Sequence, residues 1–185
     1  MIEEIFDYYI KYGQSDYIGE DVSQISHMIQ AAMLAEKNNE PTHLILACLF
    51  HDIGHLLQIE NDSGNMSKYG VKNHEKITKK FLLDNNIPEP IPSLAENHVK
   101  AKKYKTFKNP NYFNKLSNAS KQTLIFQGGP MTEQEAIEFE RDELFLESLR
   151  LREYDDNAKE IGVELRGLGY YKEMLRNYLN EREIE

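Results

Sequence analysis

One stretch decides the fold: Leu44-Ile45-Leu46-Ala47-Cys48-Leu49-Phe50, followed directly by His51-Asp52-Ile53-Gly54-His55. A helix that is apolar on every face is normally buried, so the first seven residues predict a core helix. Burying a carboxylate is costly unless it is paired or binds a metal ion. Asp52 therefore predicts a cation nearby, and His51 beside it is a suitable metal ligand. The alternative is that His51 and Asp52 only cap the helix, with Gly54 as its stop signal.

The bulk composition indicates a soluble globular protein. The chain has 185 residues, 40% hydrophobic and 29% charged, which fits a single domain over residues 1–185. Its net charge of −9 argues against a nucleic-acid backbone or an anionic membrane as partner, but is compatible with a small anionic substrate. Cys48 is the only cysteine, so no intrachain disulfide is expected. The acidic start is unlike a signal peptide, and no uninterrupted apolar run approaches the ~18 residues that span a bilayer. We therefore expect an unanchored cytoplasmic protein.

The sequence predicts an all-α fold, because good strand signals are missing while helical periodicity recurs along the chain. Thr42, Asn73 and Thr132 are expected to cap helices at their N-termini. Residues 58–72 are expected to form a polar loop, and Asn109-Pro110 a turn. The expected helices cover residues 3–11, 23–37, 42–50, 73–83, the segment after Pro92 to about 103, 117 or 118 to 126, the segment after 132, 143–160 and 170–181.

Candidate metal ligands are scattered over these helices. A single histidine on an apolar helix face is more often a core residue, but five in one small helical domain are harder to explain by chance. One metal site needs three or four ligands, and six or seven are enough for two ions about 3.5–4 Å apart. A mixed imidazole and carboxylate set suits iron or manganese without excluding zinc. The candidates are His27, His51, Asp52, His55, His74, His98 and one of Asp155 or Asp156, between which the residues alone do not choose.

The pattern of His27, His51-Asp52 and Asp155, extended by His74 and His98, resembles the dinuclear branch of the HD-domain superfamily of metal-dependent phosphohydrolases. A more detailed likeness, over about residues 17–159, is to the phosphonate-cleaving HD oxygenases, mixed-valence di-iron enzymes related to inositol oxygenase. It implies a helical bundle with a dinuclear metal site in its core. The six segments that carry it are Tyr17-Ile18-Gly19-Glu20, His51-Asp52-Ile53-Gly54-His55, Asn97-His98-Val99-Lys100-Ala101-Lys102, Leu116-Ser117-Asn118-Ala119-Ser120, Gln127-Gly128-Gly129-Pro130-Met131 and Tyr154-Asp155-Asp156-Asn157-Ala158-Lys159.

This resemblance implies a role for each matching residue. Two iron ions, Fe(II) and Fe(III), would be held by His27, His51, Asp52, His74, His98 and Asp155, with Asp52 bridging, and other divalent metals are possible. Tyr17 would bind the second iron until substrate displaces it, and Glu20 would engage the substrate amino group. The phosphonate would lie against His55, Lys102, Ser120 and Gln127. The catalytic set is then Tyr17, Glu20, His55 and Lys102. From the residues alone, Tyr17 and Glu20 would be a solvated loop and Lys102 part of a basic helix face.

The implied reaction is oxidative cleavage of the C–P bond of a 1-hydroxyphosphonate by dioxygen. The example that the resemblance suggests is 2-amino-1-hydroxyethylphosphonate, giving glycine and phosphate. The alternative enzyme is an HD phosphohydrolase that attacks a phosphate ester or nucleotide with a metal-bound hydroxide and needs no oxygen. A non-enzymatic, metal-stabilised helical domain is the third reading. It would need no anion pocket, so the matches at His55, Lys102 and Ser120 count against it.

Overall fold

The computed structural model describes residues 1–17, 19–60 and 73–182, and these residues form helices with a single isolated antiparallel bridge between Asp16 and Ser23. The all-α prediction is confirmed for this part of the chain. The helices are α1 (Ile2–Tyr12), α2 (Gln24–Lys37), α3 (Thr42–Phe50), α4 (Ile53–Glu60), α5 (His74–Asp84), α6 (Ile91–Lys108), α7 (Pro110–Lys115), α8 (Asn118–Phe126), α9 (Glu133–Phe139), α10 (Phe145–Asn157) and α11 (Leu168–Arg182).

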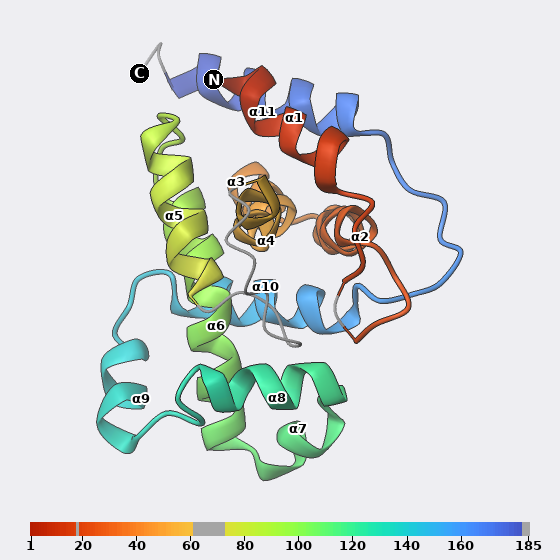
Figure 1. Cartoon of the computed structure of the whole chain (residues 1–185). Helices are drawn as coiled ribbons and strands as arrows, with labels where there is room; N and C mark the ends of the chain where they lie inside the picture. The colour runs from red at the N-terminus through yellow and green to blue at the C-terminus, as the bar shows by residue number, and fades with distance from the viewer. Residues whose placement is uncertain (18, 61–72, 183–185) are drawn as a thin grey trace.

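Helices α3 and α4 lie at the centre of the molecule and are viewed almost end-on in Figure 1, with α1, α2, α5 and α10 around them. Every residue from Leu44 to Phe50 is buried, as the apolar run predicts. The Tyr9 hydroxyl of α1 donates a 2.7 Å hydrogen bond to the Leu49 carbonyl oxygen, which ties the outer helix to the core. The residues that follow α3 therefore begin deep inside the protein, where water is excluded.

Several helix ends differ from the sequence prediction. Thr42 is the first residue of α3 and not its cap, because Pro41 takes the cap position. Asn73 precedes α5 in the left-handed conformation, with φ 64°, but its side chain makes no capping bond. The expected turn at Asn109-Pro110 instead opens α7, where the Asn109 side chain accepts a hydrogen bond from the Asn111 amide. In contrast, the Thr132–Glu135 capping box is present as predicted.

Three further boundaries move. Helix α6 continues to Lys108 instead of ending near Lys103, and α10 covers 145–157 instead of 143–160. Residues 58–60 of the expected 58–72 loop belong to α4, and 61–72 lie outside the described residues. Such shifts of a few residues are the usual error of pattern reasoning, because the last turn of a helix depends on tertiary contacts.

Gly54 fixes the distance between α4 and α5. A Cβ atom there would lie 2.3 Å from the His74 carbonyl oxygen and 2.8 Å from the Thr78 hydroxyl oxygen. The Gly54 amide donates to that hydroxyl over 3.0 Å, and the hydroxyl donates to the His51 carbonyl oxygen over 3.3 Å. Gly54 is thus a residue of α4 and not a stop signal. Its missing side chain lets the start of α5, with His74, approach the turn that carries Asp52.

One stretch, Thr42–Ile59, is long and apolar enough to cross a membrane by length and composition, with a mean hydropathy of 1.2 over 18 residues. However, 72% of that window is buried inside the protein, which is typical of the core helix of a soluble protein. The burial agrees with the prediction of a core helix from the same residues.

Candidate metal centre

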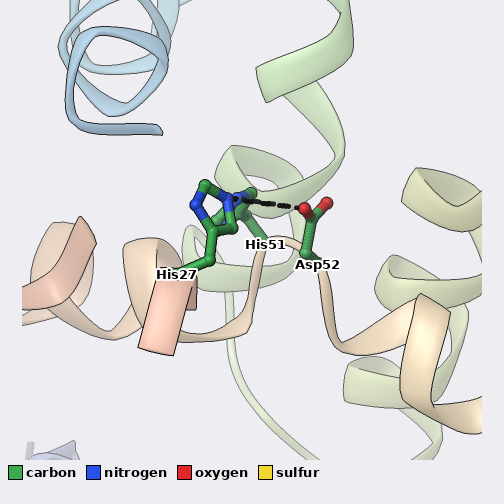
Figure 2. A group of neighbouring side chains, drawn as sticks. All are labelled: His27, His51 and Asp52. Carbon is green, nitrogen blue, oxygen red and sulfur yellow. Dashed lines mark hydrogen bonds and ion pairs between the residues drawn. The ribbon is translucent and has the colours of Figure 1, made fainter. Parts of the chain in front are cut away.

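Helices from distant parts of the chain bring a cluster of imidazoles and carboxylates together in the core. His27 comes from α2, His51 and Asp52 from the turn between α3 and α4, and Figure 2 shows these three side chains pointing toward one another. His74 is the first residue of α5, His98 lies in α6 and Asp155 in α10. All six are buried. The core therefore contains a candidate metal-binding cluster, as predicted.

The first half of the cluster surrounds one oxygen of Asp52. Its Oδ2 atom lies 3.6 Å from His27 Nε2 and 3.5 Å from His51 Nε2, and Asp155 Oδ1 lies 3.3 Å from His27 Nε2. The two Nε2 atoms are 3.1 Å apart. His27 Nδ1 contacts the Ala158 carbonyl oxygen at 2.9 Å, and His51 Nδ1 contacts the Cys48 carbonyl oxygen at 2.8 Å.

These contacts assign the tautomers of the two rings. An Nδ1 that donates to a carbonyl carries the ring proton, so the Nε2 of a neutral imidazole carries no proton and has a lone pair to offer. Two lone pairs that face each other at 3.1 Å have no proton to share. A metal ligand commonly donates its other ring nitrogen to a carbonyl in this way. The pair of His27 and His51 therefore fits a cation between the two Nε2 atoms.

The second half surrounds the other oxygen of Asp52. Its Oδ1 atom lies 3.2 Å from His74 Nε2 and 3.4 Å from His98 Nε2, and these two nitrogens are 3.1 Å apart. His98 Nδ1 contacts the Ala95 carbonyl oxygen at 2.5 Å, which again leaves Nε2 for a cation. His55 Nε2 lies 3.9 Å from the same oxygen. One carboxylate thus faces two groups of nitrogens, the arrangement expected of a ligand shared by two metal ions.

His55, which the sequence analysis counted as a candidate metal ligand and also assigned to the phosphonate, lies where it could serve either role. Among the residues that the structure describes, two groups have ligand atoms close enough to hold an ion, namely His27, His51 and Asp52, and Asp52, His55 and His74. The His55 ring is also stacked on the His74 ring, with centroids 4.1 Å apart. It therefore lies between the metal cluster and the cavity beside it, and is a candidate for either.

The carboxylates of the cluster are charged at neutral pH. Burial alone would raise the pKa of Asp52, but the His51 ring and a hydrogen bond with His74 hold it well below its usual value. Burial likewise opposes ionisation of Asp155, and the Arg152 guanidinium together with His27 holds its pKa well below normal. Two buried anions among imidazoles provide the negative charge that divalent cations require.

Most of the imidazoles are neutral, which is the form that binds metals. Burial lowers the pKa of His51, takes that of His98 well below its usual value, and lowers that of His55 to about 3. His74 is different. Burial lowers its pKa too, but the hydrogen bond with Asp52 and the negative charges of Asp52 and Glu75 together outweigh burial and raise the pKa. The donor set of mostly neutral nitrogens and charged oxygens fits a dinuclear metal site.

Arg152 separates the two neighbouring aspartates. Its guanidinium donates to Asp155 Oδ2 over 2.6 Å and to Asp156 Oδ1. The Arg152 side chain is almost fully buried, so these two carboxylates supply its counter-charge. Asp156 also accepts a 2.7 Å hydrogen bond from the Tyr112 hydroxyl, whereas Asp155 Oδ1 lies 3.3 Å from His27 Nε2. In this geometry Asp155 faces the cluster and Asp156 does not. Arg150, the other arginine considered from sequence, pairs instead with Glu40 near the surface.

A cavity of about 50 Å³ opens beside the cluster. It brings together all the residues that the sequence analysis assigned to substrate or catalysis, together with some that it missed. Lys102 extends into this space, with its ammonium donating to the Thr123 hydroxyl over 3.0 Å. The lining residues are Tyr17, Glu20, Gln24, Asp52, His55, His74, His98, Lys102, Ala119, Ser120, Thr123, Gln127, Arg152 and Asp155.

Tyr17 and Glu20 line this cavity, so they are not a loop exposed to solvent. The Tyr17 ring is stacked on His27 at a centroid distance of 4.0 Å and an interplanar angle of 14°. Burial, and then the nearby charges of Asp52 and Asp155, raise the pKa of the Tyr17 phenol well above its usual value. The phenol is therefore neutral unless a cation stabilises the phenolate. Ile18, between these two residues in sequence, lies outside the described residues.

Sequence reasoning missed the roles of two other residues here. Gln24 is 2% exposed, and its Oε1 atom has no hydrogen-bond partner among the described residues. It precedes His27 by three positions on the same helix, so helical spacing from the candidate ligand was the available signal. Lys159 donates a 2.6 Å bond to Glu20 across the chain, and no local pattern could have revealed that pair.

Comparisons with known proteins agree with this geometry. The model of the HD domain matches residues 24–150. The chain is 44% identical to "Uncharacterized protein L432" of Acanthamoeba polyphaga mimivirus, over 97% of this chain and 82% of the relative. It is 32% identical to the [1-hydroxy-2-(trimethylamino)ethyl]phosphonate dioxygenase (glycine-betaine-forming) of Leisingera caerulea, over 98% of this chain and 91% of the relative. It is 36% identical to the hydroxymethylphosphonate dioxygenase of Gimesia maris, over 92% of this chain and 84% of the relative.

Proposed function

This chain belongs to the HD-domain family, among its phosphonate oxygenases, and we propose that it cleaves the C–P bond of a 1-hydroxyphosphonate with dioxygen. One observation carries the proposal: an imidazole and carboxylate cluster that shares Asp52 opens onto a cavity whose buried cation is Lys102. The first is suited to metal ions and the second to an anion. Two relatives are named as dioxygenases of hydroxylated phosphonates, which supports the same substrate class here.

The proposed cofactor is a pair of iron ions. His27, His51 and Asp155 would hold one ion and His74 and His98 the other, with Asp52 between them, because their ligand atoms converge in the core. When bound, iron supplies the activation of dioxygen. Tyr17 is proposed as an additional ligand before substrate binds, since its ring lies against His27.

The protein side chains would bind and orient the phosphonate. Lys102 offers a positive charge held in place by Thr123, and Ser120 and Gln127 offer polar groups along the same wall. His55 Nδ1 and Gln127 Oε1 are buried without a hydrogen-bond partner among the described residues, which leaves both side chains available to a ligand. Held in this way, the substrate would direct the carbon that bears the hydroxyl group toward the metal cluster.

The overall reaction defines what must be measured. The carbon loses its bonds to phosphorus and to one hydrogen and is released as a carboxylate, while phosphorus leaves as inorganic phosphate. This four-electron oxidation matches the four-electron reduction of one dioxygen, whose two oxygen atoms are incorporated into the two products. The substrates are therefore a small anionic phosphonate and dioxygen, with no nucleic acid or membrane involved. We also propose that residues 1–185 form one domain and act in the cytoplasm.

The test is anaerobic reconstitution of the full chain with Fe(II), followed by electron paramagnetic resonance and simultaneous measurement of oxygen uptake and phosphate release. We expect a mixed-valence signal, and one dioxygen consumed for each phosphate released from a 1-hydroxyphosphonate. Methylphosphonate, which lacks the hydroxyl group, is the control and should give neither. Turnover of a phosphate ester without oxygen uptake, combined with no reaction on hydroxyphosphonates, would favour the phosphohydrolase and overturn the proposal.

A further inference from the structure

Buried polar atoms without a partner gather around the cavity beside the metal cluster. Within the described part of the chain, four buried side-chain atoms have no hydrogen-bond partner, and three belong to residues that line this cavity: Gln24 Oε1, His55 Nδ1 and Gln127 Oε1. The fourth is Glu75 Oε2. An unpaired buried polar atom is costly, so proteins rarely keep one that no ligand or water satisfies. Their grouping at one cavity indicates that a ligand supplies the missing partners.

The contacts of Gln24 show which end of its side-chain amide is unpaired. Gln24 is the first residue of α2 and is 2% exposed. Its Nε2 atom donates to the Asp16 carbonyl oxygen over 3.4 Å, and because a carbonyl only accepts, the reversed amide would lose this bond. Its backbone amide donates to the Ser15 carbonyl oxygen over 2.9 Å, so the residue is held from two sides. The unpaired atom is therefore the acceptor, the carbonyl oxygen Oε1.

The part of the cavity formed by α6 and α8 offers donors instead. The Lys102 ammonium donates to the Thr123 hydroxyl over 3.0 Å, and the Ser120 hydroxyl lines the same space. The oxygens of an ionised phosphonate are acceptors, so they match these groups and not Gln24 Oε1. The donors of a 1-hydroxyphosphonate are its O–H group and, where the carbon chain is aminated, an N–H group. Gln24 precedes His27 by one helical turn, so its acceptor is placed to meet such a donor beside the metal cluster.

We propose that Gln24 is a substrate-binding residue whose Oε1 atom accepts a hydrogen bond from an O–H or N–H group of the phosphonate substrate. The inference rests on the proposed function and adds a contact for the part of the substrate that is not the phosphonate. A hydroxyl and an amine offer the same chemistry to this oxygen, and the experiment distinguishes them. In either case, a compound that has the donor gains affinity from Gln24, and one that lacks the donor does not.

The experiment measures Kd by calorimetry for the Fe(II)-loaded full chain without oxygen, with two pairs of compounds. Hydroxymethylphosphonate and methylphosphonate differ in the O–H group. The second pair, 2-amino-1-hydroxyethylphosphonate and its trimethylated analogue, differs in the N–H group, while both compounds carry a positive charge. We expect Gln24→Met, which removes the amide, to weaken binding of the donor-bearing compound of one pair about tenfold more than binding of the other compound. Gln24→Glu keeps an acceptor oxygen and should retain the wild-type difference within that pair.

Gln30→Met is the matched control for loss of a buried amide from the same helix. The Gln30 side chain donates to the Ser26 hydroxyl and to the Glu160 carbonyl oxygen, both over 2.9 Å, and it does not line this cavity. This variant should lower the melting temperature and leave the ratio of Kd values within each pair unchanged. Iron content and the melting temperature of each variant show whether the fold is intact.

The outcomes separate this inference from the proposed function. If Gln24→Met weakens both members of each pair equally, or weakens neither, Gln24 only holds the segment at Asp16, and the inference is overturned while C–P cleavage stands. Should Gln24→Met not fold, Gln24→Asn, which withdraws the acceptor by about 1.5 Å, is measured with the same pairs and decides the question. If no phosphonate binds and none is consumed with oxygen, the proposed function fails and the inference fails with it.

Discussion

Replacing Asp52 by Asn tests whether one carboxylate serves two metal ions. Its Oδ1 atom lies 3.2 Å from His74 Nε2 and its Oδ2 atom 3.5 Å from His51 Nε2, so the change affects both halves of the cluster at once. A ligand that binds only the folded state, at a concentration 100 times its Kd, stabilises that state by about 2.7 kcal/mol. Two such ions give about 5 kcal/mol. In a domain of this size that corresponds to a rise in melting temperature of roughly 10–20 °C.

The assay is thermal unfolding of the metal-free protein before and after addition of Fe(II) under anaerobic conditions, with metal content measured in parallel. We expect the wild type to bind two ions per chain and to gain the full shift, and Asp52→Asn to lose more than half of it. Asp84→Asn is the matched control, because Asp84 pairs with Lys80 on the surface and should not matter. The reasoning is refuted if Asp52→Asn keeps the wild-type shift, or if Fe(II) leaves the wild-type melting temperature unchanged.

Four further changes test other parts of the site. Burial lowers the pKa of Lys102 to about 7, so the ligand-free site loses its positive charge above that pH. The Kd for inorganic phosphate, measured by calorimetry, should therefore rise between pH 7 and 9. Lys102→Arg should show a smaller rise than the wild type, because arginine stays charged over this range. Arg152→Met leaves Asp155 and Asp156 without their shared partner, so we expect a loss of about 3–5 kcal/mol in the free energy of unfolding by urea titration. Tyr17→Phe should abolish visible absorbance of the oxidised, iron-loaded protein if the phenolate binds ferric iron, and an unchanged spectrum would remove Tyr17 from the ligand set. Gly54→Ala places a Cβ atom 2.3 Å from the His74 carbonyl oxygen, so it should push α5 away from α4 and lower the melting temperature by several degrees.

Sequence alone could predict those parts of the fold that depend on local chemistry. The core helix follows from seven consecutive apolar residues, and the capping box at Thr132 from hydrogen bonds within one turn. The α7 helix was missed, because a six-residue helix gives too short a pattern to distinguish from a turn. The role of Gly54 was also missed, since a close approach of two helices leaves no trace in the spacing of either one.

The contacts of the pocket were the least predictable, because they join residues that are far apart in the chain. Glu20 and Lys159 are separated by 139 positions, and their pairing depends on how the segment after α10 crosses α2. The assignment of Glu20 to a substrate amine came from family resemblance, which implies a role for a residue but not its ion-pair partners. The structure adds the ion pair between Glu20 and Lys159, which no pattern within either segment indicates.

The choice between Asp155 and Asp156 depends on helical spacing along α10, which the motif match did not take into account. Successive residues of a helix point about 100° apart, so Asp155 and Asp156 direct their carboxylates to different sides of α10. The buried residues of α10 are Ser148, Leu151, Arg152 and Asp155, which recur at intervals of three, one and three along the chain. Leu151 sets the phase of this stripe, and the position four residues later is Asp155, not Asp156. The same stripe places Arg152 inside the protein, where a guanidinium needs carboxylates on both sides, and both aspartates supply them.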